Sequence, residues 1–200
     1  MRSRVQLRLD RCHPVAFVLA LLVCSCGHRA LQASAAPVPA RNLISNGDFS
    51  RGVAPWGVHA VGGTNSEQPP QPRLADGALC TTVHGGEEIV VGWPVSGSAE
   101  AFALVAGERY ELSLRVAAPG PLPVECVIKV GHQLAPYTAA FATRLPAGET
   151  LEPFSIAFAP DHVDDRAGIA LECRAAPGST VADVCIDDVR LTTARGQPGG

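Results

Sequence analysis

The residues best equipped for chemistry in this chain form the run Asp161-His162-Val163-Asp164-Asp165. Imidazole and carboxylate groups act as general acids and bases and bind divalent metals, so the run could belong to an enzyme or to a metal site. It follows Pro160 and precedes an apolar alternation that begins near Ile169. Acidic runs between such alternations are common turn material. We therefore interpret residues 161–165 as a solvated acidic loop.

A second acidic pair, Glu87-Glu88, has the composition of a glycosidase site but not its geometry. Adjacent residues of a strand point to opposite faces of a sheet, so the two carboxylates cannot flank one glycosidic bond. The sequence also contains no G-x-S-x-G, H-E-x-x-H or P-loop motif. We expect a non-catalytic protein.

Four of the seven cysteines follow the first 26 residues, and these are Cys80, Cys126, Cys173 and Cys185. No two of them have the C-x-x-C spacing of common zinc sites, which argues against a metal role. An even number of cysteines in an exported chain indicates two disulfides. The alternative is four reduced thiols in a cytosolic protein, and the N-terminal segment argues against it.

The N-terminal segment has the features of a secretory signal. Four arginines within the first 11 residues precede the apolar run 15–23, which is too short to span a bilayer as a mature helix. The run ends in Val23-Cys24-Ser25-Cys26-Gly27, which is typical of a bacterial lipoprotein cleavage box. Residues 1–26 are therefore predicted to be a signal peptide, with Cys26 lipidated. The alternative is ordinary cleavage at Ala33-Ser34-Ala35.

This leader predicts an exported protein, either an outer-membrane or cell-surface lipoprotein or a secreted one. The lipid anchor is the expected membrane contact, and we expect a monomer. Four of the 16 basic residues and one of the 19 acidic residues precede Cys26, so the remainder has 12 basic and 18 acidic residues and a formal charge of −6. That charge has the wrong sign for a nucleic-acid partner.

The rest of the chain reads as one domain with flexible ends. Residues 27–41 are small and rich in Pro and Ala, which is typical of a tether. Residues 42–193 contain short apolar alternations separated by Gly, Pro and Asp, the spacing of an all-β sandwich. Residues 194–200 form a tail rich in Gly.

Alternation within the predicted strands assigns side chains to faces. The apolar faces comprise Tyr110, Leu112, Leu114 and Val116; Val124, Cys126, Ile128 and Val130; Phe154, Ile156 and Phe158; and Ile169, Leu171 and Cys173. Cys126 and Cys173 both face the core, so a disulfide between them is permitted. Val127, Lys129, Ala170 and Glu172 lie on the opposite face, which is either a solvated surface or a binding platform.

Two segments near the ends of the domain carry acidic residues that suggest termini held side by side. The opening segment is Asn-Leu-Ile-Ser-Asn-Gly-Asp-Phe at 42–49, followed by Gly52 and Trp56, and the closing segment is Cys-Ile-Asp-Asp-Val-Arg-Leu at 185–191. Four further segments lie between them, at 77–80, 107–113, 130–137 and 154–158.

In this order the six segments resemble the carbohydrate-binding modules of the cellulose-binding family 4/9 type, which are attached to bacterial cellulases and xylanases. The resemblance spans about residues 42–191. It implies an antiparallel β-sandwich of the galactose-binding-like jelly-roll type.

The resemblance also implies two devices that close the fold. One is a Cys80–Cys185 disulfide, which leaves Cys126 to pair with Cys173. The other is a structural Ca²⁺ held by Asp48, the Gly77 carbonyl and Asp187, which are the hard oxygen ligands that calcium prefers. Alternatively, Asp48 caps a turn and Asp187 pairs with an arginine such as Arg190.

In the family, sugars lie along the concave sheet, with aromatic rings on pyranose faces and polar groups on hydroxyls. By position, the residues facing this cleft are Gly57, His59, Trp93, Val95, Val127, Lys129, Gln133, Tyr137, Ala170 and Glu172. Trp93 and Tyr137 are the implied stacking platforms. The implied hydroxyl partners are His59, Lys129, Gln133 and Glu172. Trp56 is assigned to the core, because large aromatic residues are usually buried.

The sequence thus favours non-catalytic binding of a polysaccharide or oligosaccharide by an exported module that accompanies glycoside hydrolases. Members that bind cellulose carry several amides and an additional tyrosine along the cleft, where this chain has His59, Gly168 and Lys129. This difference argues against cellulose as the ligand and leaves two alternatives, a different glycan or none. The alternative is a structural or adhesive cell-surface lipoprotein that makes protein contacts with the same fold.

Overall fold

The computed structural model describes residues 40–61, 70–95, 99–120, 123–132, 134–135, 137–177 and 181–194. All of them belong to one compact unit, Val38–Gly200. The predicted signal peptide, Cys26 and Gln133 lie outside the described residues. Within those residues the regular structure consists of strands, and there is no helix long and apolar enough to span a membrane.

The first sheet carries the strands that hold most of the predicted binding residues. Its order is β1 (Gly57–Val61), β4 (Glu88–Trp93), β10 (Asp164–Ala175), β7 (Val124–His132) and β8 (Ala139–Leu145), and the short β5 (Phe102–Leu104) pairs with the start of β10. The central β10 pairs with β4 on one side and β7 on the other, both antiparallel.

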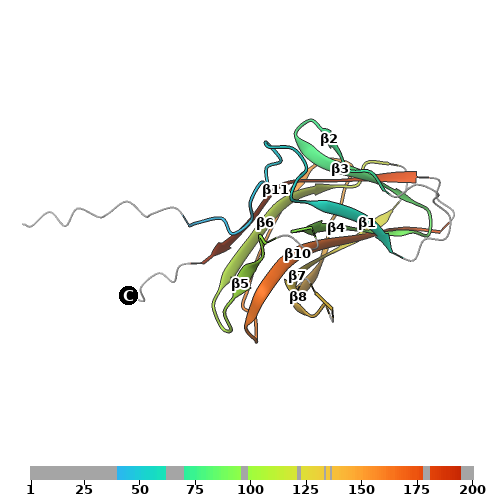
Figure 1. The fold of residues 1–200 in the computed structure, drawn as a ribbon. Coiled ribbons are helices and arrows are strands. Elements are labelled where there is room, and N and C mark those ends of the chain that lie inside the picture. The colour runs from blue at the N-terminus through green and yellow to red at the C-terminus, as the bar shows by residue number, and fades with distance from the viewer. Residues whose placement is uncertain are drawn as a thin grey trace, which may run out of the picture. The chain divides into compact units, whose positions relative to one another are not determined.

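The second sheet contains the closing segment. Its order is β2 (Arg73–Ala75), β3 (Ala78–His84), β11 (Val181–Thr193), β6 (Tyr110–Ala117) and β9 (Glu152–Phe158). The pairings between these strands are antiparallel. Figure 1 shows the two sheets as layers that face each other, with β11 beside β6. The predicted antiparallel β-sandwich is confirmed.

The core lies between the layers and follows the alternation in the sequence. Tyr110, Leu112, Leu114 and Val116 of β6 are buried, and so are Ile169, Leu171 and Cys173 of β10. Trp56 is also buried, as predicted, and its ring lies 5.3 Å from that of Phe49. Burial of these large apolar side chains supplies most of the driving force for folding.

Both predicted disulfides are present, Cys80–Cys185 and Cys126–Cys173. Each joins directly opposed residues of neighbouring strands in one sheet, β3 to β11 and β7 to β10. The second bridge is buried, which agrees with the facing predicted for its two cysteines.

The opening and closing segments lie side by side, as the sequence suggested. The Leu43 amide donates to the Leu191 carbonyl at 2.8 Å, and the Val189 amide donates to the Gly47 carbonyl at 2.9 Å. A Cβ at Gly47 would meet the Val189 carbonyl oxygen at 2.0 Å, so only glycine permits this approach. The turn that follows is fixed by the buried Asn46, whose amide donates to two backbone carbonyls.

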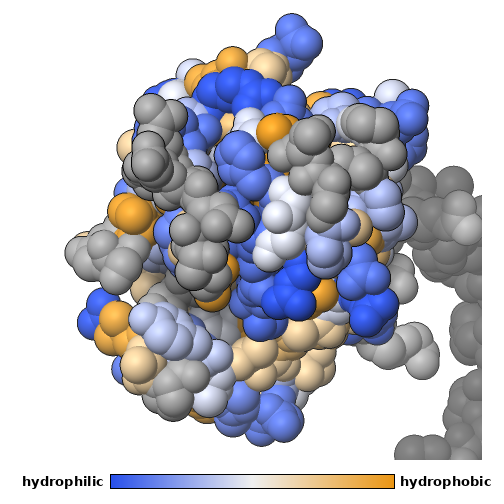
Figure 2. Space-filling model, turned by 90° about the vertical axis from the view of Figure 1, so that its right-hand side faces the viewer, coloured by the Kyte–Doolittle hydropathy of each residue, from blue (hydrophilic) through white to orange (hydrophobic). Residues whose placement is uncertain are grey.

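Figure 2 shows one side of the molecule, where hydrophilic residues gather near the middle and hydrophobic ones form small, separate groups. Scattered apolar residues are normal on a protein surface and do not mark a binding site.

Candidate ligand-binding cleft

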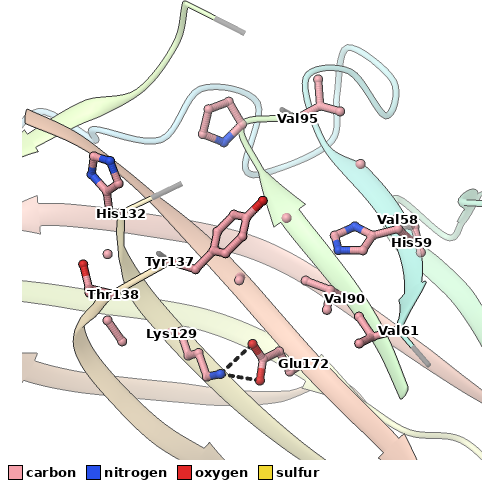
Figure 3. A pocket seen from close by; sticks show the side chains of 16 residues that line it. Val58, His59, Val61, Val90, Val95, Lys129, His132, Tyr137, Thr138 and Glu172 are labelled. Carbon is pink, nitrogen blue, oxygen red and sulfur yellow. Dashed lines mark hydrogen bonds and ion pairs between the residues drawn. The ribbon is translucent and has the colours of Figure 1, made fainter. Parts of the chain in front are cut away.

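A cleft of about 680 Å³ lies on the outer face of the first sheet (Figure 3). Its lining mixes apolar side chains with a few polar ones and consists of Gly57, Val58, His59, Val61, Val90, Gly92, Pro94, Val95, Lys129, Gly131, His132, Tyr137, Thr138, Ala139, Ala170 and Glu172. A largely apolar cavity with a few placed polar groups is the usual composition of a small-molecule or oligosaccharide site.

Small residues in adjacent strands form the floor of the cleft. Gly92 of β4 lies opposite Gly57 of β1 on one side and Ala170 of β10 on the other. Ala170 in turn lies opposite Lys129 of β7. A row of residues with little or no side chain leaves a shallow trough across strands whose other faces are buried in the core.

An ion pair between neighbouring strands lies in this trough. The Lys129 Nζ is 2.6 Å from both Oε1 and Oε2 of Glu172, and both side chains are only partly exposed (Figure 3). The pair is diagonal in the β7–β10 register, where long side chains can meet. Each group keeps capacity for further hydrogen bonds, so together they offer a donor and an acceptor to a hydroxylated ligand.

Tyr137 projects over the cleft from the segment between β7 and β8. Tyr137 is 71% exposed, and its backbone φ is 52°. The Tyr137 amide donates to the Leu134 carbonyl at 2.7 Å, and the His132 amide donates to the Thr138 carbonyl at 2.9 Å. A Cβ at Gly131 would meet the Thr138 carbonyl oxygen at 2.3 Å, so this glycine allows the segment to fold back tightly.

Tyr137 combines an exposed ring with a strained backbone, unlike a buried core tyrosine. A positive φ is uncommon for a bulky residue and is found where surrounding structure enforces it, often at binding sites. Figure 3 shows the ring standing over the trough, with His132 on one side and His59 on the other. The ring can offer a face or an edge to a ligand in the cleft.

Five of the eight predicted ligand-binding residues meet at this cleft: His59, Val95, Lys129, Tyr137 and Glu172. Val127 shares the outer face of β7 with Lys129 and lies opposite Glu172, but it does not line the cavity. Gln133 lies outside the described residues.

The prediction that Trp93 is a stacking platform is wrong. Its side chain is 1% exposed and stacks on Phe102 at a centroid distance of 5.8 Å inside the core. Ile89 and Val91 of the same strand are buried, and alternation places Trp93 on their face, while Val90 and Gly92 point into the cleft.

The cleft also contains residues that sequence reasoning missed, including Val90, His132 and Thr138. Strand alternation along residues 88–93 would have found Val90. His132 and Thr138 lie where the pairing of β7 with β8 shifts register, and alternation does not predict side-chain direction there.

The run at 161–165 is only in part a solvated loop. Asp161 and His162 are exposed and pair with each other at 2.6 Å. Asp164 is instead buried at the start of β10, where its Oδ1 lies 2.8 Å from His132 Nδ1. The interpretation of the whole run as solvated is therefore wrong for Asp164, because a shift in the pairing of β10 with β5 turns this residue inward.

The predicted calcium ligands lie in or beside the opening and closing segments. Hydrogen bonds from Ser50 lower the pKa of the Asp48 carboxyl, which caps its turn. Burial raises the pKa of Asp187, and the charges of Asp188 and Asp48 act in the same direction. Asp187 lies 3.5 Å from Arg115, while Arg190 pairs with Asp188.

The chemistry of this donor set fits a hard cation. The β3–β11 register ends with Leu79 opposite Ile186, so the next steps bring Gly77 toward the closing segment. Two carboxylates and a carbonyl are ligands that Ca²⁺ accepts, and a cation would stabilise the charged form of the half-buried Asp187. The residues present therefore suit the predicted ion, which stays a prediction.

Several solved structures share this sandwich, although no family model and no curated protein matches the sequence. A CBM4 module is 21% identical with a TM-score of 0.53, covering 72% of this chain and 99% of that one. The N-terminal cellulose-binding domain of Cellulomonas fimi β-1,4-glucanase C is 21% identical with a TM-score of 0.52, covering 77% and 97%. The second such domain of that enzyme is 24% identical with a TM-score of 0.50, covering 80% and 98%.

The chain has the jelly-roll fold of carbohydrate-binding modules. At these identities the likeness concerns the fold, and the names of the Cellulomonas fimi domains describe what those domains bind. What this jelly roll binds must be argued from its own cleft.

Proposed function

We propose that this protein is a non-catalytic carbohydrate-binding module that holds a polysaccharide or oligosaccharide in the cleft of the first sheet. Tyr137 would stack on a sugar ring, while His59, Lys129 and Glu172 would bond hydroxyl groups. Val95 would add apolar contact at the edge. Val127 and Gln133 are further candidate contacts of the ligand.

The observation that carries this proposal is the exposed Tyr137 ring above an apolar trough with a built-in ion pair. Exposing a large aromatic ring on a strained backbone is unfavourable unless a ligand covers it. Pyranose rings have apolar C–H faces and polar edges, so they match a ring platform beside hydrogen-bonding groups.

The test is a screen of soluble and cell-wall polysaccharides by glycan array and affinity gel electrophoresis. We expect at least one glycan to bind the full chain, and Tyr137→Ala to weaken its affinity by roughly 1–3 kcal/mol, the range for loss of a large binding aromatic. Leu74→Ala is the matched control, because Leu74 is an exposed apolar residue on β2 of the other sheet.

Failure of every glycan to bind would overturn this function. Binding that survives Tyr137→Ala but is lost in a variant of another surface would move the site away from the cleft. A protein partner that is captured by the chain and survives Tyr137→Ala, in the absence of glycan binding, would support the structural or adhesive alternative.

Two further features belong to this proposal. We propose that Asp48, the Gly77 carbonyl and Asp187 hold a structural Ca²⁺ that joins the two ends of the domain. We also propose export, with lipidation at Cys26, because two disulfides are suited to an oxidising compartment. Mass spectrometry of the mature N-terminus separates lipidation from cleavage at Ala33-Ser34-Ala35.

A further inference from the structure

We propose that His132, Asp164 and Asp165 bind a divalent transition-metal cation of the zinc type at the edge of the cleft. The cation site is separate from the predicted calcium site, which lies in the opening and closing segments. It is also independent of the proposed glycan binding, since it rests on different side chains.

The backbone brings the three residues together. His132 is the last residue of β7 and lies opposite Ala167 of β10. Between Asp164 and Ala167 the pairing with β5 shifts register, because three steps along β10 match two steps along β5. Bulges of this kind redirect side chains. One imidazole nitrogen and two carboxylate oxygens of these residues lie within 4.8 Å of one another.

The buried Asp164 provides the second observation. Its side chain is 3% exposed, and its Oδ1 already accepts from the Arg166 amide at 2.9 Å and contacts His132 Nδ1 at 2.8 Å. Its Oδ2 is buried and has no hydrogen-bond partner among the described residues. An unpartnered carboxylate oxygen in the interior is costly, and a bound cation would offset that cost.

The ligand set selects the class of cation. Imidazole nitrogen favours zinc and related transition metals over calcium or magnesium, and carboxylates complete such sites. Ligand atoms around a tetrahedral zinc lie about 3.4 Å apart at bond lengths of ~2.1 Å, so modest side-chain movements would close this group on the ion.

The place of the site gives it a route to solvent. Asp165 is exposed and His132 lines the cleft, beside Thr138 (Figure 3). Three protein ligands leave a coordination position for water or for an oxygen of a molecule in the cleft. A metal-binding imidazole nitrogen must be unprotonated, so the neutral His132 ring would bind the cation through one nitrogen and keep its proton on the other.

The test titrates Zn²⁺ into the metal-free full chain by isothermal calorimetry and follows the His132 imidazole resonances by NMR. All proteins carry Cys12→Ser, Cys24→Ser and Cys26→Ser, because thiolates bind zinc. We expect Zn²⁺ to shift the His132 resonances, and His132→Gln and Asp165→Asn each to weaken that binding event by roughly tenfold or more. Asp165 is exposed, so its variant should remain folded even if an Asp164 variant does not.

The matched control is His162→Gln, since His162 also pairs with an aspartate but lies in an exposed loop. It should leave Zn²⁺ affinity unchanged. Absence of Zn²⁺ binding, or equal affinity in His132→Gln, Asp165→Asn and the parent, would overturn the site and show that the His132–Asp164 pair only stabilises the bulge. Failure in the glycan screen leaves this result unaffected, because the titration contains no sugar.

Discussion

Trp93 and Tyr137 show how two aromatic residues with the same implied role come to have different ones. Trp93 completes the buried row of Ile89 and Val91, whereas Tyr137 is held outside the sheet by the segment after Gly131. Their positions in the family pattern implied that both rings stack on the ligand. Alternation along residues 88–93 is the stronger guide for Trp93, since it follows from strand geometry alone.

Trp93→Ala should therefore act on stability. We expect it to lower the free energy of unfolding by about 3–5 kcal/mol, the cost of truncating a buried aromatic side chain, measured by urea denaturation. Trp93→Phe should cost much less, because Trp93 Nε1 is buried without a partner among the described residues and its loss leaves no group unsatisfied. If Trp93→Phe lost as much glycan affinity as Tyr137→Ala, Trp93 would have to contact the glycan after all.

At the level of strands, the sequence predicted most of the side chains that face the core but not the places where strand pairing shifts register. The buried rows of β6 and β10 follow directly from apolar alternation, and this also permitted the Cys126–Cys173 bridge. Asp164 and His132 could not be placed together in this way. Their contact depends on a register shift and on two strands that are distant in sequence, and neither leaves a periodic signal.

The junction of the opening segment with β11 gives a prediction for pH and calcium. Burial raises the pKa of Asp187 above its ordinary value of 3.8, so the folded protein holds this proton more tightly than the unfolded chain. Without calcium, stability from this group is therefore present at low pH and is lost as pH rises through the raised pKa. At neutral pH, Asp187→Asn should leave the calcium-free thermal midpoint unchanged or higher.

With calcium bound, the wild type should instead be more stable than Asp187→Asn. The wild type should gain about 2.7 kcal/mol when free calcium is a hundredfold above Kd, and Asp187→Asn should gain much less. Asp183→Asn is the control on the same strand, because Asp183 pairs with Arg73 and belongs to neither end segment. Equal calcium-dependent shifts of the thermal midpoint in all three proteins, measured by calorimetry, would show that Asp187 does not bind the ion.

The residues that close the fold and the residues that line the cleft lie in different parts of the sandwich. β11 and the Cys80–Cys185 bridge belong to the second sheet, and the opening segment is hydrogen-bonded to β11, whereas the cleft lies on the outer face of the first sheet. The end segments that most clearly indicated the fold therefore lie away from the cleft residues. This explains why motif order predicted the architecture better than it predicted the site.

Removing one disulfide or the other should therefore affect stability and glycan affinity to different extents. Cys80–Cys185 closes a separation of 105 residues and Cys126–Cys173 one of 47, so chain entropy assigns them about 4.8 and about 4.0 kcal/mol of stability. The second bridge lies on the core side of the sheet beneath the Glu172 end of the cleft, because Cys173 follows Glu172 in β10 and faces the opposite side. Replacing Cys126 and Cys173 by alanine should therefore loosen the strands that hold Lys129 and Glu172.

We expect this variant to lose more glycan affinity than the Cys80→Ala, Cys185→Ala variant, even though the latter loses at least as much stability by the same entropy estimate. Urea denaturation and affinity electrophoresis on the same samples, at a temperature where both variants are folded, measure the two effects separately. If affinity falls in proportion to stability in both variants, the bridge beneath the cleft has no positioning role and acts through global stability alone.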